Sequence, residues 1–347
     1  MRCRWWSARL AAVCIAVALG APSVAAEVAA PVAHEQDWST SGVALPQTCL
    51  IGMTVEDLGG FDYTRHSFEA LLWVWSRCPL AEIQPLARSA KFPTGRALQI
   101  ETDPPYFVAE DAFVEYQRVQ GTFQHDWNLA DFPFDVQTLR IPLDELDYGE
   151  DTLVFAPDPT PNGSIYVERD PIPGFRVTDF DVTGERIAFA SNYGDADASG
   201  GFATSSIVAT VELSRSSYIG FFKLCVGAFA GALLALTSFF IRPDETSGYT
   251  AQLRTGIGGV FAVLVSLNVA ANALGNPTYL TLVDQIHIAS LVLVLATVVV
   301  AMIERRRTEL GLPIVYPNYR LASGFLAVYL GVIGLLVANA AGLFAPA

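Results

Sequence analysis

The sequence lacks the residue groupings on which most enzyme active sites depend. Its four histidines lie far apart, no serine or cysteine nucleophile motif is present, and no glycine-rich phosphate loop follows a predicted strand. Basic charge is also scarce, because 21 Lys and Arg residues face 35 Asp and Glu residues, for a net charge of −14. So acidic a chain is a poor partner for nucleic acid. We therefore expect no catalysis, no cofactor, no metal site and no nucleic-acid partner.

Long hydrophobic runs are present, but the first of them is too short to cross a membrane. Arg2, Arg4 and Arg9 precede the apolar run 10–19, and a small-residue cleavage site ends at Ala26. A membrane-spanning helix needs roughly 20 residues. The pattern therefore indicates a secretory signal peptide over residues 1–26. The chain that follows is expected to begin outside the cytoplasm.

Cysteine is sparse, and its five copies fall into different regions. Cys3 and Cys14 leave with the signal peptide, and Cys225 lies in an apolar segment. Cys49 and Cys78 lie in the exported region, where an oxidising compartment permits a disulfide. Sequence alone leaves open whether these two residues lie close enough to form it.

Composition divides the rest of the chain into two parts. Residues 27–217 carry 30 acidic against 11 basic residues, a net charge of about −19, and are long enough for one β domain. From residue 218 onward only five acidic residues remain, and apolar runs occupy about 219–241, 256–274, 282–303 and 321–344. Each run is long enough to cross a bilayer as a helix. The first and third connections carry arginines whereas 275–281 carries no Lys or Arg, which places the first and third in the cytoplasm.

Alternating patterns predict strands in the exported part. They cover residues 49–58, 67–77, 112–119, 138–143, 177–190 and 202–215, with a turn at 59–62. Five carboxylates follow the fourth of these strands within residues 144–151. They lack the spacing of a calcium-binding loop, so a solvated acidic turn is the favoured interpretation over a divalent-cation site. The strands predict an all-β, immunoglobulin-like sandwich.

A stiff aromatic turn lies between two of these strands. Pro133 fixes its own backbone and pushes Phe132 toward an extended conformation, so Phe132-Pro133-Phe134 presents two aromatic rings. Asp131 and Asp135 flank the rings and are available for local backbone or for a cation. An ordinary proline-containing loop of a β-sandwich is the simpler interpretation.

The order of these features resembles the Cys-loop, or pentameric ligand-gated, ion channel superfamily. The segment 132–137, a Leu213-Ser-Arg215 junction directly before the first span, and four spans with a cytoplasmic linker of about seventeen residues are similar to its prokaryotic branch. His125 and Leu139 stand where animal members have the cysteines of the loop. The resemblance implies a homopentamer in a bacterial inner membrane. Arg215 is then expected to pair with Asp131 or Asp135, since a partly buried guanidinium needs carboxylate partners; a membrane-interface anchor is its alternative role.

The resemblance also implies an agonist site between neighbouring subunits. Trp75 would supply one wall, and the other would hold aromatic candidates from later loops. These candidates are Tyr106, Tyr148, Tyr193 and Phe202. Core packing is the alternative for every one of them. The agonist would be a small molecule or a proton.

The second span carries a stripe of small residues at helical spacing. Its members are Thr255, Gly259, Ala262, Ser266 and Val269. Such a stripe is typical of a tight helix-packing face or of a pore lining, and the resemblance favours the pore. A Tyr-x-Thr-x-x-Asp signature ending at Asp284 follows Pro277 and is expected to receive the push of the exported domain.

Ionisable residues at membrane depth need a partner or a route to water. Lys223 is expected either to reach the outer interface or to pair with Asp284. His287 is a weak candidate for sensing pH. The acidic exported domain favours cations as permeant ions, although Arg254 at the inner end of the second span opposes this. The alternative function is a membrane-anchored ligand sensor that conducts no ions.

Overall fold

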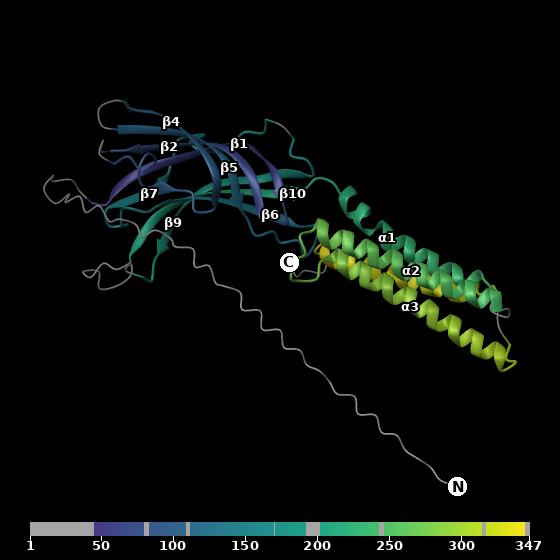
Figure 1. Cartoon of the computed structure of the whole chain (residues 1–347). Coiled ribbons are helices and arrows are strands. Elements are labelled where there is room, and N and C mark those ends of the chain that lie inside the picture. The colour runs from purple at the N-terminus through teal and green to yellow at the C-terminus, as the bar shows by residue number, and fades with distance from the viewer. Residues whose placement is uncertain are drawn as a thin grey trace, which may run out of the picture.

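The computed structural model describes residues 45–79, 83–108, 112–169, 171–191, 202–242, 246–313 and 317–343, without the side chains of 104–108 and 246. A β-sandwich forms the first part, and four long helices extend from one end of it (Figure 1). This is the fold class that the composition predicts. The predicted signal peptide lies outside the described residues.

Ten strands of the described chain form two sheets. The larger sheet has the order β4-β5-β2-β1-β7, with β8 paired to β1, and the smaller has the order β3-β6-β10-β9. The strands are β1 (Gln47–Asp62), β2 (Ser67–Cys78), β3 (Ala90–Lys91), β4 (Gly95–Val108), β5 (Ala112–Gln124), β6 (Val136–Glu145), β7 (Leu153–Pro157), β8 (Ile165–Tyr166), β9 (Phe175–Ala188) and β10 (Ala203–Arg215). Most neighbours are antiparallel, whereas β7 and β8 run parallel to β1.

Alternate residues of the strands build the core between the two sheets. Successive side chains of a strand point to opposite faces, so every second residue of a strand reaches the interior. In β10 the fully buried apolar residues are Ile207, Ala209, Val211 and Leu213, and in β1 they are Cys49, Ile51, Met53 and Val55. The alternation that predicts β10 is therefore confirmed.

Strand β1 runs further than the sequence predicts. The expected turn at 59–62 is instead part of the strand, and the pairing of β1 with β2 shifts register between Gly59 and Asp62. Gly60 adopts a φ of 58°, a conformation that glycine reaches without strain. The two glycines thus form a β-bulge rather than a turn, and the turn follows at residues 63–66.

A disulfide joins the two neighbouring strands β1 and β2. Cys49 and Cys78 are bonded across a sequence separation of 29 residues, and both are buried. The question that the sequence leaves open is therefore decided in favour of the bond. A cross-link over a loop of this length stabilises a fold by about 3 kcal/mol, chiefly by restricting the unfolded chain.

Four helices follow, and each is long and apolar enough to cross a membrane. They are α1 (Ile219–Leu236), extended by the 3₁₀ turn η2 (Thr237–Phe240), α2 (Thr246–Ala273), α3 (Leu282–Glu309) and α4 (Tyr319–Ala340). Helix α2 starts at Thr246 rather than at residue 256, and α3 continues past residue 303 to Glu309. Hydropathy identifies only the apolar part of a helix. The polar turns at the start of α2 and at the end of α3 are therefore not predicted from the sequence.

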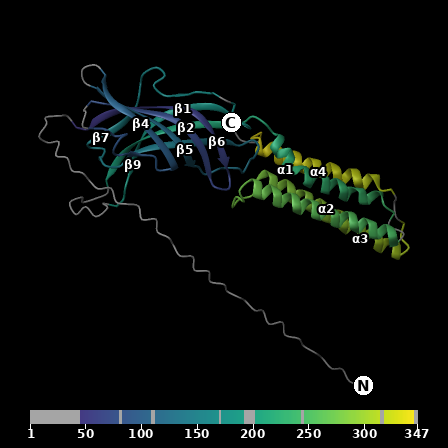
Figure 2. The same cartoon turned by 45° about the horizontal axis from the view of Figure 1, so that its top comes forward.

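Helices α1, α2 and α3 pack closely, and α4 lies on the outside of the bundle, alongside α1 in the view of Figure 2. Helix α4 packs on α3, where the hydroxyl of Tyr329 lies 2.7 Å from Ser290 Oγ. Close packing of α1 on α2 rests on glycine: a Cβ on Gly231 would lie 2.8 Å from the carbonyl oxygen of Gly259. Small residues at such crossings let backbones approach within a membrane. Helix α4 has only two buried residues, Ala322 and Tyr329.

Candidate functional site

The junction between sandwich and helices is built around Arg215, the last residue of β10. Its Nε and Nη2 atoms donate hydrogen bonds to the carboxylate of Asp135 at 3.0 and 2.9 Å. The side chains are only 9% and 3% exposed. Bidentate pairs of this kind combine charge with fixed geometry. Of the two expected partners, Asp135 binds Arg215 and Asp131 is exposed, so Arg215 does not act as an interface anchor.

Aromatic rings enclose the guanidinium group of Arg215. Its Cζ atom lies 4.2 Å from the ring centroid of Phe175 and 4.6 Å from that of Phe132. Its Nη1 atom donates to the hydroxyl of Tyr63 at 3.0 Å. Cation–π contacts of this type strengthen as water is excluded. The pair therefore ties together β10, the proline-containing loop and the β1–β2 turn.

The proline-containing loop also hydrogen-bonds the connection between α2 and α3. The N–H of Leu282 donates to the carbonyl oxygen of Ala130 at 2.8 Å. The hydroxyl of Tyr279 accepts from the N–H of Leu129 at 2.8 Å and donates to the carbonyl oxygen of Trp127 at 3.0 Å. These three bonds join the sandwich to the beginning of α3 directly.

The β1–β2 turn contacts the same connection through Gly275. This glycine ends α2 with a φ of 77°, and a Cβ there would lie 2.5 Å from the carbonyl oxygen of Tyr63. Only glycine meets both demands, a left-handed backbone and close approach of another chain segment. Two loops of the sandwich thus lie against the connection between α2 and α3.

The two aromatic residues of the proline-containing loop have different contacts. Phe132 is buried against Arg215 and lies near the first turn of α1, where a Cβ on Gly220 would be 3.8 Å from its ring. Phe134 lies 5.6 Å from the ring of Tyr218, the residue before α1. Phe132 therefore belongs to the joint itself, and Phe134 lies against the start of the first helix.

Asp284 caps the start of α3 and does not pair with Lys223. Its carboxylate accepts the N–H of Thr281 at 2.9 Å and the Thr281 hydroxyl at 2.8 Å, while the hydroxyl of Thr281 accepts the N–H of Asp284. This is a capping box that starts α3. The expected pair with Lys223 does not form, and Lys223 is exposed on α1. Pro277 lies half-buried in the same connection.

The small-residue stripe of α2, which is predicted to line a pore or to pack on other helices, contacts α1 and α3 of the same chain. Gly259 meets Gly231 of α1 and Val294 of α3, and a Cβ on Gly231 would lie 3.4 Å from the Cβ of Ala262. The hydroxyl of Ser266 donates to the carbonyl oxygen of Leu224 at 3.1 Å. Small residues mark helix packing as readily as they mark a pore, and here packing prevails. Thr255 is half-buried and only Val269 of the stripe is exposed.

Ser266 also contacts His287, which the sequence places near the membrane interface. His287 is fully buried, with Nδ1 2.7 Å from the carbonyl oxygen of Val283 and Nε2 2.9 Å from Ser266 Oγ. The three groups connect α1, α2 and α3 through one serine hydroxyl. His287 therefore has the contacts of a helix-packing residue.

A different face of α2 is exposed in the single chain. It carries large apolar residues in its middle, arginine at its end away from the sandwich and asparagine at its end near the sandwich. Its members are Arg254, Ile257, Phe261, Leu264, Val265, Asn268 and Asn272. We call this set the open face of α2.

The asparagines of the open face form a polar ladder. Asn272 donates to the side-chain oxygen of Asn268 at 3.1 Å, and Asn276 donates to that of Asn272 at 3.3 Å. All three are exposed. Uncompensated polar side chains inside a bilayer are costly and normally face protein or water. The four-residue spacing of these asparagines is visible in the sequence and is the signal that was missed.

The expected ligand-site aromatics that the structure describes lie on different sheets of the chain. Trp75 lies on the outer face of the larger sheet, where its Nε1 donates to Asp158 at 3.2 Å. Tyr148 follows β6 in the smaller sheet, and Phe202 precedes β10, where its ring stacks on Phe189 at 4.9 Å. Tyr193 lies outside the described residues, and the side chain of Tyr106 is likewise outside them.

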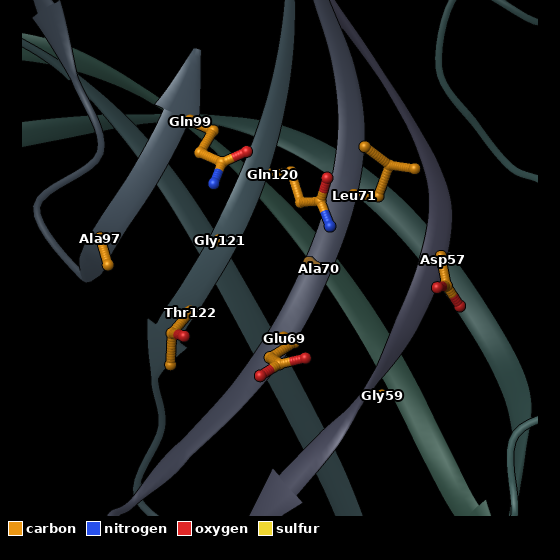
Figure 3. Close-up of a pocket in the computed structure, with 10 residues that line it drawn as sticks. All are labelled: Asp57, Gly59, Glu69, Ala70, Leu71, Ala97, Gln99, Gln120, Gly121 and Thr122. Atoms are coloured by element: carbon orange, nitrogen blue, oxygen red, sulfur yellow. The ribbon is translucent and has the colours of Figure 1, made fainter.

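A shallow hollow of about 220 Å³ lies on the outer face of the larger sheet (Figure 3). The hollow lies where β1 and β4 have bulges. Its floor includes Gly59 and Gly121, which have no side chains to fill it. Asp57, Glu69 and Gln120 are among its polar lining residues, and all three are exposed. None of the expected aromatic residues lines it.

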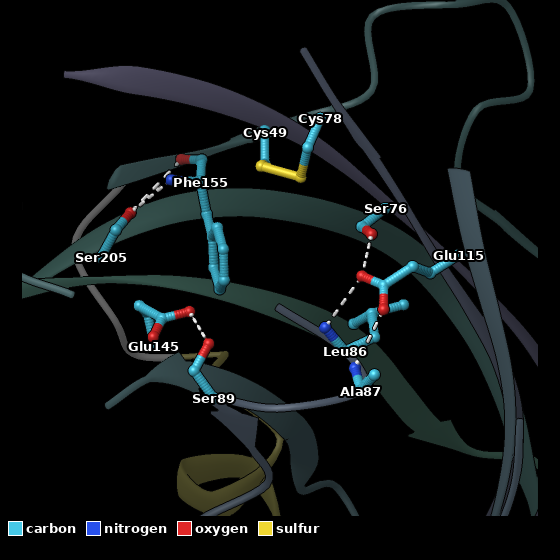
Figure 4. The surroundings of a disulfide bond; sticks show 10 residues. All are labelled: Cys49, Ser76, Cys78, Leu86, Ala87, Ser89, Glu115, Glu145, Phe155 and Ser205. Carbon is cyan, nitrogen blue, oxygen red and sulfur yellow. Dashed lines mark hydrogen bonds between the residues drawn. A yellow bond between two sulfur atoms is a disulfide. The ribbon is translucent and has the colours of Figure 1, made fainter. Parts of the chain in front are cut away.

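Two glutamates are buried at the end of the sandwich far from the helices (Figure 4). Glu145 accepts hydrogen bonds from the Ser89 hydroxyl at 2.7 Å and from the N–H groups of Asp147 and Tyr148 at 3.0 and 3.3 Å. Burial raises the pKa of Glu145 to about 7, although these bonds oppose the shift. The acidic segment 144–151 is therefore not simply a solvated turn.

The second glutamate holds the connection between β2 and β3. Glu115 accepts from the Ser76 hydroxyl at 3.0 Å and from the N–H groups of Leu86 and Ala87 at 3.2 and 3.1 Å. Burial raises its pKa as well. Glu115 and Glu145 thus bind one loop from the two sheets. Among the described residues, no cluster of His, Cys, Asp and Glu has metal-binding geometry.

No protein-family model matches the chain, and no curated protein matches it either. The junction, the open face of α2 and the buried glutamates are therefore interpreted from their own geometry.

Proposed function

We propose that the protein is a subunit of a homopentameric ligand-gated ion channel of a bacterial cell membrane. The observation that carries the proposal is the junction: the loops bound to Arg215 and Asp135 lie against the start of α1 and the connection between α2 and α3. A movement of the sandwich therefore displaces the ends of the helices. This coupling is what a ligand-gated channel needs, because its helices must move to open and close a pore.

The open face of α2 is the proposed pore lining. Its ladder of asparagines favours water over lipid as the neighbour at the outer end. Phe261 and Leu264 supply an apolar constriction further in, and Arg254 ends the path. Rings of side chains and apolar constrictions are how such pores select and gate. This replaces the small-residue stripe as the lining.

The proposed agonist site lies between the sandwiches of neighbouring subunits. Trp75 on one sheet and Tyr148 and Phe202 on the other are placed at different faces, so two subunits are needed to bring them together. The loop that carries Tyr148 is held by Glu145. The agonist is a small molecule or a proton, and binding there would be passed along the strands to the junction.

Cations are the proposed permeant ions. The exported part of the chain is strongly acidic, and its field concentrates cations near the outer mouth. Arg254 on the open face acts against this preference. Measurement of reversal potentials in asymmetric salt decides the balance; a shift toward the chloride potential would contradict cation selectivity.

Recording from planar bilayers tests the function. Purified full-length protein is reconstituted while pH and small amines are scanned, and its oligomeric mass is measured in parallel. We expect an evoked current from a pentamer, and a weaker response to the same agonist in Tyr148→Ala at unchanged single-channel conductance. An intact oligomer that stays silent in every condition would support a non-conducting sensor instead.

A further inference from the structure

A polar group between the helices joins α1, α2 and α3 in the half of the bundle nearer the sandwich. Ser266 of α2 is its centre, because its hydroxyl lies 3.1 Å from the carbonyl oxygen of Leu224 in α1 and 2.9 Å from Nε2 of His287 in α3. His287 is fully buried. A Cβ on Gly227 of α1 would lie 2.7 Å from Ser266 Oγ. Helix α1 therefore holds this oxygen in place, and only its hydrogen is free to turn.

The three contacts of this group need one proton more than a neutral histidine supplies. Carbonyl oxygens only accept, so the 2.7 Å contact with Val283 requires a hydrogen on Nδ1, and the bond to Leu224 uses the hydrogen of the Ser266 hydroxyl. The contact between Nε2 and Ser266 Oγ then requires a hydrogen on Nε2 as well. Both ring nitrogens carry hydrogen only in the imidazolium form. All three bonds therefore form together only when His287 is charged.

A neutral His287 gives a different set of bonds. Its hydrogen stays on Nδ1, where the carbonyl oxygen of Val283 accepts it, and Nε2 becomes an acceptor. The hydrogen of Ser266 then turns from Leu224 to Nε2, because lone pairs that face each other at 2.9 Å repel. In this form Ser266 bonds α2 to α3 alone, whereas in the imidazolium form it bonds α2 to both α1 and α3.

No ion pair with a described residue fixes the charge of His287. Asp284, one turn earlier on α3, is bound by Thr281. On the other helices the ionisable groups nearest to these contacts are Lys223 and Cys225 on α1, Tyr329 on α4 and Arg254 on α2. The lysine is exposed, the thiol is buried, the tyrosine bonds to Ser290, and the arginine lies about three turns from Ser266. A charge without a counterion is costly at membrane depth, so the imidazolium form needs acidification.

We propose that the Ser266 hydroxyl is a two-position hydrogen-bond switch between α1 and α3, set by the protonation of His287. On acidification, Nε2 takes a proton from the water at the sandwich end of the helices, and the hydroxyl turns to Leu224. At higher pH the proton returns to that water, and the hydroxyl turns back to Nε2. The switch itself does not depend on ion conduction. Its consequence rests on the proposed function: it sets how firmly the pore-lining helix is bound to α1, which directly follows Arg215.

The ring nitrogens of His287 report the switch directly. Full-length protein with nitrogen-15-labelled histidine is placed in lipid nanodiscs, and the signals of His287 are those that His287→Gln lacks in magnetic resonance spectra. Histidine is the side chain that changes charge between pH 5 and pH 8. We expect a hydrogen on Nδ1 at both pH values and a hydrogen on Nε2 at pH 5 only. A neutral ring with its hydrogen on Nε2, or a ring that does not change between the two pH values, would overturn the proposal.

Thermal unfolding of the same protein counts the hydrogen bonds of Ser266. Its hydroxyl makes one bond when His287 is neutral and two when it is charged. We therefore expect Ser266→Ala to lower the unfolding temperature about twice as much at pH 5 as at pH 8. An equal loss at both pH values would contradict the switch.

Ser290→Ala is the matched control for this measurement. Its hydroxyl is buried one turn further along α3 and bonds to the carbonyl oxygen of Ile286 and the hydroxyl of Tyr329. Neither group titrates between pH 5 and pH 8, so the loss of unfolding temperature should be the same at both. A loss that grows equally on acidification in Ser290→Ala and Ser266→Ala would show a general weakening of the bundle and would also count against the switch.

Discussion

Asp135 and Glu145 stand at the two ends of strand β6, roughly 33 Å apart by the rise of an extended chain, and both are buried. Asp135 has a guanidinium as its partner. Glu145 has only a hydroxyl and two backbone N–H groups. One end of the strand is therefore held by a buried ion pair, while the other carries a carboxyl group whose pKa is raised to about 7.

The difference separates two physical roles along a single strand. Near the helices, the buried ion pair between Arg215 and Asp135 links β10 to the proline-containing loop, which contacts the ends of the helices. Far from the helices, protonation changes what Glu145 offers to the loop that carries Tyr148.

Asp135→Asn is expected to have the largest effect. It leaves the buried guanidinium of Arg215 without a countercharge, which costs about 4 kcal/mol. Thermal unfolding in detergent measures the loss. Glu185→Gln is the matched control, because it breaks the exposed pair between Arg140 and Glu185, where less than about 1 kcal/mol is expected. If both variants lowered the unfolding temperature equally, the buried pair of Arg215 and Asp135 would contribute no more to stability than the exposed pair of Arg140 and Glu185.

Loss of the disulfide is expected to follow. Replacing Cys49 and Cys78 by Ala frees the unfolded chain and lowers stability by about 3 kcal/mol. The unfolding temperature of the wild type in reducing buffer should approach that of the double variant, which itself should not respond to reductant. A wild type that is indifferent to reductant while the variant is destabilised would show that lost packing, not the cross-link, carries the effect.

Glu145→Gln is expected to change how the stability of the fold depends on pH. The folded-state pKa of Glu145 is raised from 4.5 to about 7, so its protonated form stabilises the fold. That contribution is complete below about pH 4.5 and is lost as the pH rises through about 7, which amounts to about 3 kcal/mol.

The glutamine keeps the hydrogen bonds, since its oxygen accepts the two N–H groups and its amide donates to Ser89. The difference in unfolding temperature between variant and wild type should therefore grow between pH 5 and pH 8. The exposed Glu101→Gln serves as control. A difference that stays constant with pH would contradict the assignment of the titration to Glu145.

Tyr279→Phe is expected to have the smallest effect on stability. It removes the two hydrogen bonds that the hydroxyl makes with the backbone of Trp127 and Leu129, which costs about 1–2 kcal/mol. We expect Tyr279→Phe to weaken the response to agonist as well, because it loosens the contact between the proline-containing loop and the α2–α3 connection. In bilayer recordings, the agonist concentration for half-maximal current should rise; an unchanged dose response would show that this contact does not transmit the signal.

The sequence predicts those features that rest on strong local signals. Apolar length identifies the four helices, alternation identifies β10, and a stiff Phe-Pro-Phe turn before Asp135 identifies the loop that binds Arg215. The choice between Asp131 and Asp135 needs coordinates, since both carboxylates flank the same turn and only one points inward.

Other features depend on what surrounds a residue, and the sequence does not record this. The stripe of Gly259, Ala262 and Ser266 has the same spacing whether it packs on α1 or lines a pore. Glu145 lies in a run of acidic residues that resembles a solvated turn, and its burial results from the loop held by Ser89. In both cases tertiary packing overrides the local pattern.

Cysteine accessibility during current recording tests the central claim most directly. In a Cys225→Ala background, cysteines are placed at Phe261, Leu264 and Asn268 of the open face and at Ala262 of the packed face, and a charged water-soluble thiol reagent is applied to the open channel. The account predicts that current changes on modification at one or more open-face positions and not at Ala262. Modification at Ala262 alone, or at none of the open-face positions, would contradict it.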